Sequence, residues 1–189
     1  QQMASIFDTD MARRRGLVLS DATCSGATTA HVLGAWNELP AQLDALRPET
    51  RLVTLTIGGN DVGYIGSLRS ATCKALSLGA TIGGPCESIH MPDAAAWKKL
   101  RASLRLIVSR VRARSPQARL VFVDYATILP PGTPCSRAPM SDADAGVARR
   151  LAARLAQITA DVARESGADL LAASKLTRDH HACAADPWM

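Results

Sequence analysis

The chain has 189 residues, of which 47% are hydrophobic and 21% charged, a composition typical of one globular domain with a hydrophobic core. No apolar run reaches the roughly 20 residues that a membrane-spanning helix needs, so we expect no stable membrane insertion. The net charge is +5, but the arginines are spread along predicted helices and aromatic residues make up only 4%. This pattern argues against a nucleic-acid groove.

The first quarter of the chain predicts short elements. Residues 2–15 carry apolar side chains at helical spacing and predict an amphipathic helix that ends at Gly16. Three further elements are predicted before residue 50: a strand over 17–19, a helix from Thr28 or Thr29 to Gly34, and a helix over 40–46.

Residues 52–57 predict a strand that is buried on both faces, because the run contains only aliphatic and β-branched residues. Gly58 and Gly59 end it and allow a sharp turn. Asn60 then follows at the carboxyl end of the strand, where open parallel sheets bind their ligands. Its side chain offers two uncharged amide donors, which is the chemistry of an oxyanion hole. A plain tight turn is the alternative interpretation.

The second half contains two long amphipathic helices. The first has an apolar stripe from Trp97 to Val111, and the second begins at the capping residue Ser141 and ends at Gly167. Two strands accompany them, at 120–123 and 168–171, and two long loops or excursions lie at 63–92 and 124–140. Strands that alternate with helices predict a parallel α/β sheet with helices on both faces, in a single domain over residues 1–189.

The five cysteines all lie in loops rich in Gly, Pro, Ser and Thr, and none has the spacing of a zinc site. Such cysteines suggest disulfides in an oxidising, secreted environment. Cys73 and Cys86 bracket one excursion and are paired for that reason. Cys135 and Cys183 are paired by elimination, which leaves Cys24 alone. The alternative is that all five are free thiols.

Three sequence blocks resemble a known hydrolase family. They read TCSGATT at 23–29, LVTLTIGGNDVGY at 52–64 and HACAADPW at 181–188. Together they resemble the secreted actinobacterial branch of the SGNH (GDSL) hydrolases, which are esterases and lipases. The resemblance covers essentially the whole chain in order. It implies a flavodoxin-like three-layer α/β/α sandwich with a parallel sheet.

The resemblance also implies a chemistry, the hydrolysis of carboxylic esters by a serine nucleophile without a cofactor or metal. Gly26 matches the family's second-block glycine, whose backbone N–H donates to the oxyanion. Asn60 matches the third-block asparagine, whose side-chain amide does the same. This role for Asn60 agrees with the interpretation drawn from the strand and turn alone.

Two blocks of the family are not found in the chain. The Gly-Asp-Ser block after the first strand, which holds the nucleophile, has no match. The Asp-x-x-His block, which holds the base, is approached only by Asp179, His180 and His181 at the wrong spacing. We therefore expect that the chain lacks the first strand, the serine and the histidine of the family. We also expect that the partner of Cys24 lies in the absent N-terminal part.

The other polar residues near these blocks have mainly structural interpretations. Ser25 is interpreted as a turn serine that hydrogen-bonds its own backbone, and His31 as a packing residue. Asp61 is interpreted as a helix cap or a group behind the site. His180 and His181 are adjacent, so they face opposite ways in an extended backbone, and one of them could line the substrate cleft.

The sequence thus predicts a secreted, monomeric carboxylic ester hydrolase that acts on a small-molecule or lipid ester and has no nucleic-acid partner. One alternative is a non-catalytic protein of the same fold that binds acyl or glycan ligands. A second alternative is a cytoplasmic α/β binding domain with free thiols.

Overall fold

The computed structural model describes residues 12–77, 86 and 88–188. Its sheet is formed by three strands: β1 (Leu52–Leu55), β2 (Arg119–Val123) and β3 (Asp169–Leu171). The strands are parallel and lie in the order β1-β2-β3. The predicted parallel α/β sheet is confirmed.

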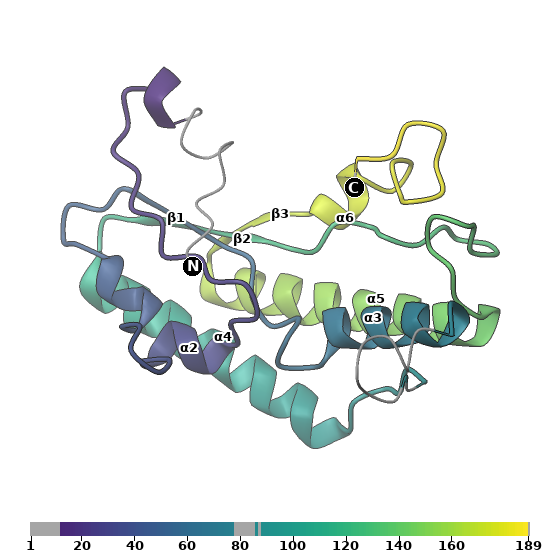
Figure 1. Cartoon of the computed structure of the whole chain (residues 1–189). Helices are drawn as coiled ribbons and strands as arrows, with labels where there is room; N and C mark the ends of the chain where they lie inside the picture. The colour runs from purple at the N-terminus through teal and green to yellow at the C-terminus, as the bar shows by residue number, and fades with distance from the viewer. Residues whose placement is uncertain (1–11, 78–85, 87, 189) are drawn as a thin grey trace.

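The described helices connect and cover these strands. They are α2 (Thr29–Leu33), the 3-10 helix η1 (Gln42–Ala45), α3 (Tyr64–Ala75), α4 (Ala94–Arg114), α5 (Asp142–Ser166) and α6 (Ala173–Leu176). Figure 1 shows α2, α3, α4 and α5 on one side of the sheet, whereas α6 lies just past the end of β3, next to the C-terminal residues. No helix in the described part of the chain is long and apolar enough to cross a membrane.

The core lies between the sheet and the two long helices. Along β2, Leu120 and Phe122 are buried, while Val121 and Val123 on the opposite face are only half-buried. The apolar stripes of α4 and α5 supply most of the remaining core: Leu100, Leu104, Ile107, Val108, Val111, Leu151, Leu155, Ile158 and Val162. Each fully buried aliphatic side chain contributes about 1.5–3 kcal/mol, so these helices form the rigid base of the fold.

Both long helices begin at a side-chain cap, of which the one at Ser141 was predicted from the sequence. The side chain of Asp93 accepts a hydrogen bond from Ala96 N at 2.7 Å at the start of α4, and Ser141 accepts one from Asp144 N at 3.0 Å at the start of α5. The helix α5 ends at Gly167, as predicted from the sequence.

The predicted strand at 17–19 is wrong. Leu17, Val18 and Leu19 form no regular structure, and Val18 is 101% exposed. A strand needs a neighbour for its N–H and C=O groups, and within the described residues none pairs with this segment. The helix expected over 40–46 is the short η1. The strand expected over 52–57 ends at Leu55, and it is not buried on both faces, since Leu52 and Thr54 are exposed. Most of the helix expected over 2–15 lies outside the described residues.

Part of the arginine surplus is used in ion pairs between the two long helices. On α4, Arg101 and Arg105 contact Glu165 of α5, and Arg101 also lies 3.5 Å from Asp161. The hydrogen bond from Arg105 lowers the pKa of Glu165, and the one from Arg164 lowers the pKa of Asp161. These groups are solvent-exposed, so the pairs orient the surfaces of the helices more than they stabilise the fold.

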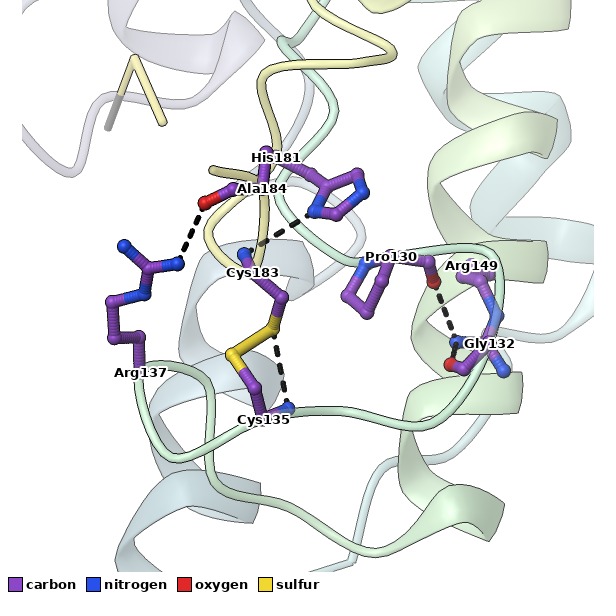
Figure 2. Close-up of a disulfide and its surroundings, with 8 residues drawn as sticks. All are labelled: Pro130, Gly132, Cys135, Arg137, Arg149, His181, Cys183 and Ala184. Carbon is purple, nitrogen blue, oxygen red and sulfur yellow. Dashed lines mark hydrogen bonds between the residues drawn. A yellow bond between two sulfur atoms is a disulfide. The ribbon is translucent and has the colours of Figure 1, made fainter. Parts of the chain in front are cut away.

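Two disulfides, the pairs expected from the sequence, fasten the long excursions. Cys73–Cys86 closes the segment after α3, and Cys135–Cys183 joins the loop after β2 to the C-terminal residues. Figure 2 shows the second bridge beside Arg137, whose guanidinium donates to Ala184 O at 2.6 Å. Cys24 is free and partly buried.

We predict that removal of the longer bridge costs more stability than removal of the shorter one. The loop-entropy relation gives about 4 kcal/mol for the double replacement of Cys135 and Cys183 by serine, whose separation is 48 residues. For Cys73 and Cys86, separated by 13 residues, it gives about 3 kcal/mol. Urea unfolding of oxidised protein measures both values.

Cys24→Ser is the matched control, and we expect it to have a small effect because this thiol is unbridged. Thiol titration of the denatured, unreduced 189-residue chain should give one thiol, and five after reduction. Five thiols without reductant would contradict the bridges.

Candidate functional site

The first part of the candidate site is a tight turn that precedes α2. Ala27 N donates to Cys24 O at 3.1 Å, so Ser25 and Gly26 are the two central residues of the turn. Gly26 has φ of +86°, which a type II turn requires at this position and which favours glycine. Ser25 is therefore a turn residue, and it is exposed.

The second part is the loop that follows β1, and Asn60 joins it to the first. The side-chain nitrogen Nδ2 of Asn60 donates to Ala27 O at 2.9 Å, across 33 positions of sequence. A carbonyl oxygen only accepts, so this contact fixes which end of the amide faces the turn. The two residues singled out in the sequence, Gly26 and Asn60, thus lie on adjoining loops.

Within the described residues, Gly26 and Asn60 each have one N–H group without an acceptor. An asparagine amide has two N–H groups, and Ala27 O takes only one of them. Within the described part of the chain, the N–H of Gly26 has no hydrogen-bond partner. Both Gly26 and Asn60 are exposed. The loops therefore present two neutral N–H donors to the solvent, from a backbone and from a side chain.

Asp61 locks the same two loops together from behind. Its carboxylate accepts from Thr29 N at 2.9 Å and also from the hydroxyl of Thr29, which is itself buried. Thr29 is the first residue of α2, so Asp61 caps this helix. The sequence suggested that Asp61 caps the helix that follows it, but α3 begins after Gly63. Asp61 therefore caps a helix whose first residue lies 32 positions before it in the chain.

Tyr125 also contacts the loop that follows β1. It follows β2, and its hydroxyl oxygen accepts from Gly59 N at 2.9 Å. A Cβ atom at Gly59 would lie 2.7 Å from the Tyr125 ring and hydroxyl, so only glycine fits beneath it. No pattern in the sequence assigned a role to Tyr125. The signal was its position directly past the carboxyl end of the strand that neighbours β1.

The electrostatics of the two tyrosines follow from their burial. Tyr64 is 2% exposed and packs edge-to-face on Tyr125, with ring centroids 5.8 Å apart. Burial, with a smaller contribution from Tyr125, raises the pKa of Tyr64 to about 12. Burial also raises the pKa of Tyr125, and the hydrogen bond from Gly59 opposes that rise. Tyr125 is thus a neutral hydroxyl at physiological pH.

Three of the four histidines make local contacts, whereas His90 is exposed. The ring of His31 stacks on Trp36 at 4.1 Å, and its Nδ1 accepts from Thr28 N at 3.1 Å as part of a capping box. His180 Nδ1 lies 2.8 Å from Asp186 O, and its ring stacks on Trp188. His181 accepts from Cys183 N at 3.2 Å beside the disulfide, as Figure 2 shows.

The described residues contain no hydrogen bond between a serine and a histidine side chain. A serine nucleophile requires such a base, correctly oriented. What this part of the molecule holds is therefore an array of neutral donors, and it assigns neither the nucleophile nor the base.

Comparisons with known proteins identify the family of the chain. The sequence matches the GDSL-like lipase/acylhydrolase family over residues 3–189. It is 33% identical over 181 residues to Lipase 2 of Streptomyces coelicolor, a match that covers 93% of this chain and 61% of that protein. It is 26% identical over 178 residues to a lipase of Streptomyces rimosus, with 94% of this chain and 62% of that protein covered. The chain thus spans about three fifths of the length of these relatives.

The fold agrees as well. The crystal structure of phospholipase A1 from Streptomyces albidoflavus NA297 superimposes with a TM-score of 0.73 and 24% identity, covering 95% of this chain and 71% of that one. That of the extracellular lipase from Streptomyces rimosus gives a TM-score of 0.64 and 24% identity, with 88% and 65% covered. At 24% identity, these two structures show that the chain shares their α/β fold. The chain belongs to the GDSL-like lipase/acylhydrolase family.

We predict that Tyr64 of the folded protein stays protonated at pH 10, where free tyrosine is half ionised, and that Tyr125 is less ionised there than free tyrosine. Because the pKa of Tyr64 is raised, its stabilising contribution is complete below pH 10 and is lost as the pH rises toward about 12, since the tyrosine of the unfolded chain ionises first. For Tyr64, a rise from 10.0 to about 12 corresponds to about 3 kcal/mol.

Ultraviolet absorbance of tyrosinate, measured with and without urea, gives the ionised fraction of the tyrosines in the folded and unfolded chain. The signal is simple to assign because the chain has only two tyrosines. Tyr64→Phe should remove most of the alkaline loss of stability. Half-maximal tyrosinate absorbance of the folded protein at pH 10 would show that the rings are not buried as described.

Proposed function

We propose that the protein containing this chain hydrolyses carboxylic esters, and that the N–H of Gly26 and the side-chain amide of Asn60 stabilise the oxyanion. One observation carries the proposal. The hydrogen bond from Asn60 Nδ2 to Ala27 O holds the amide against the turn in which the N–H of Gly26 has no partner within the described residues.

Ester hydrolysis needs such a pair of donors when the tetrahedral oxyanion forms. A nucleophilic hydroxyl adds to the ester carbonyl carbon, and the C=O electron pair moves onto oxygen to give a tetrahedral oxyanion. Collapse of this intermediate expels the alcohol and leaves an acyl-enzyme, which water hydrolyses to the acid. Donors fixed in advance stabilise the oxyanion without reorganising, and they do so in both halves of the reaction.

The chemical character of the two donors fits that task. Both are neutral, so they carry no counter-charge that would bind a product carboxylate too tightly. They also come from different elements, and Asp61 and Tyr125 hold the loop of Asn60 from two further directions. Side chains on a braced loop keep the geometry that such catalysis demands.

The relatives support an ester as the substrate. Those compared above are named lipase and phospholipase A1, and a further relative, 27% identical over 138 residues, is named esterase in Streptomyces scabiei. We propose that this chain shares their bond type. By the same family relation, the nucleophile is proposed to be a serine.

We also propose that the protein is secreted. Two disulfides in loops are typical of proteins that fold in an oxidising compartment. One of the structural neighbours is described as an extracellular lipase, which points in the same direction.

We predict that Asn60→Ala lowers kcat for hydrolysis of a p-nitrophenyl ester by about 10²–10³-fold and changes KM little. The reason is that the amide acts on the developing oxyanion rather than on the bound ester. The measurement uses the natural protein that contains these residues, at several ester concentrations.

Asn37 provides a matched control, since it is the other asparagine of the chain and lies exposed in a turn with φ of +54°. Aspartate also tolerates this backbone region, so Asn37→Asp should keep full activity. Asn60→Asp should lose at least as much as Asn60→Ala because it places a carboxylate beside the oxyanion. If Asn60→Ala retained kcat within threefold, the proposed role would be wrong. If the unaltered protein bound esters without hydrolysing them, a non-catalytic binding protein of this fold would be favoured.

A further inference from the structure

Tyr125 and Gly59 form a contact that the donor chemistry does not itself require. The two residues are separated by 66 positions of sequence, and the tyrosine hydroxyl accepts from Gly59 N at 2.9 Å. The aromatic ring also covers Gly59 so closely that a Cβ atom there would overlap it. Tyr125 is therefore fitted to this glycine both by shape and by a hydrogen bond.

Gly59 is the residue directly before Asn60, and its backbone is held on both sides. Its N–H is bound by Tyr125, and its carbonyl oxygen accepts from Tyr64 N at 2.8 Å. The peptide group between Gly59 and Asn60 is planar, so fixing that carbonyl also fixes the plane from which Asn60 departs. The direction of the Asn60 side chain is thereby constrained before its amide meets Ala27.

Asn60 needs such support because of where it lies. It is exposed, and the strand that leads to it is only four residues long. Displacement of a reacting or stabilising group by about 1 Å can cost a factor of ~10² in rate. A surface loop keeps its geometry to this precision only if its backbone is fixed by the core. Tyr125 provides that link, because it lies two residues past the end of β2, the central strand of the sheet.

We propose that Tyr125 is a positioning residue that orients the Asn60 amide through its hydrogen bond to Gly59. The inference rests on the proposed ester hydrolysis. In this arrangement the hydroxyl of Tyr125 does not touch the substrate, and its effect on the reaction passes entirely through the loop of residues 58–60. Its ring packs on Gly59, whereas its hydroxyl sets the direction of the Asn60 amide.

The test is Tyr125→Phe in the natural protein, because this change removes the hydroxyl and keeps the ring. We expect kcat for a p-nitrophenyl ester to fall about tenfold, the effect of one hydrogen bond, while KM stays within twofold. Tyr64→Phe is the matched control, since it deletes the hydroxyl of the neighbouring ring and keeps the backbone hydrogen bond from Tyr64 N to Gly59 O. Its kcat should stay within twofold of the unaltered protein.

A second readout separates positioning from packing. In ¹⁵N-labelled protein, Tyr125→Phe should speed exchange of the Gly59 amide and shift the Asn60 side-chain amide resonances, with the fold retained by circular dichroism. Tyr64→Phe should do neither.

The outcomes are distinct. If the unaltered protein hydrolyses esters and Tyr125→Phe keeps kcat within twofold, Tyr125 does not position Asn60 and the proposed function stands. A fall in kcat with unmoved Asn60 resonances also overturns the inference, because the loss then comes from elsewhere. If the unaltered protein does not hydrolyse esters, the proposed function fails and this inference fails with it.

Discussion

The hydrogen bond between Asn60 Nδ2 and Ala27 O is the contact on which the candidate site depends. It joins the turn before α2 to the loop after β1 and sets the direction of the Asn60 amide relative to Gly26. A single hydrogen bond is worth only about 1 kcal/mol, so it cannot hold two loops by itself. The surrounding structure makes it persistent, because Asp61 ties the loop after β1 to the first turn of α2, and Tyr125 fixes the loop from the adjacent strand.

The contacts of Asp61 and Tyr125 are effective because the core supports the elements that carry them. The apolar stripes of α4 and α5 pack against β2, and β2 delivers Tyr125 to the carboxyl edge of the sheet. Parallel strands end at the same edge, so residues that follow β1 and β2 meet there although they are far apart in sequence. The disulfide Cys135–Cys183 fastens the C-terminal residues to the loop after β2, and Ala182 N adds a hydrogen bond to Ile128 O. The helices thus supply the rigidity, and the loops at one edge supply the chemistry.

Much of this fold follows from local patterns in the sequence. The helical stripes and the two ends of α5, at Ser141 and Gly167, depend on residues that are neighbours along the chain. The strand predicted at 17–19 is wrong because strand formation depends on a hydrogen-bonding partner, which local sequence does not reveal. Tyr125 was missed for a related reason, since its contact with Gly59 spans 66 residues and has no periodic signature. For the site, the pairing of Gly26 with Asn60 came from family blocks, whereas the braces required the three-dimensional structure.

The most direct test of the oxyanion role is the crystal structure of the natural protein inhibited by an alkyl phosphonate, whose phosphoryl oxygen mimics the oxyanion. Our account predicts that this oxygen accepts hydrogen bonds from both Gly26 N and Asn60 Nδ2, with Asn60 still bound to Ala27 O. A phosphonate whose phosphoryl oxygen is bound by other donors, or faces solvent, would contradict the assignment of these two residues.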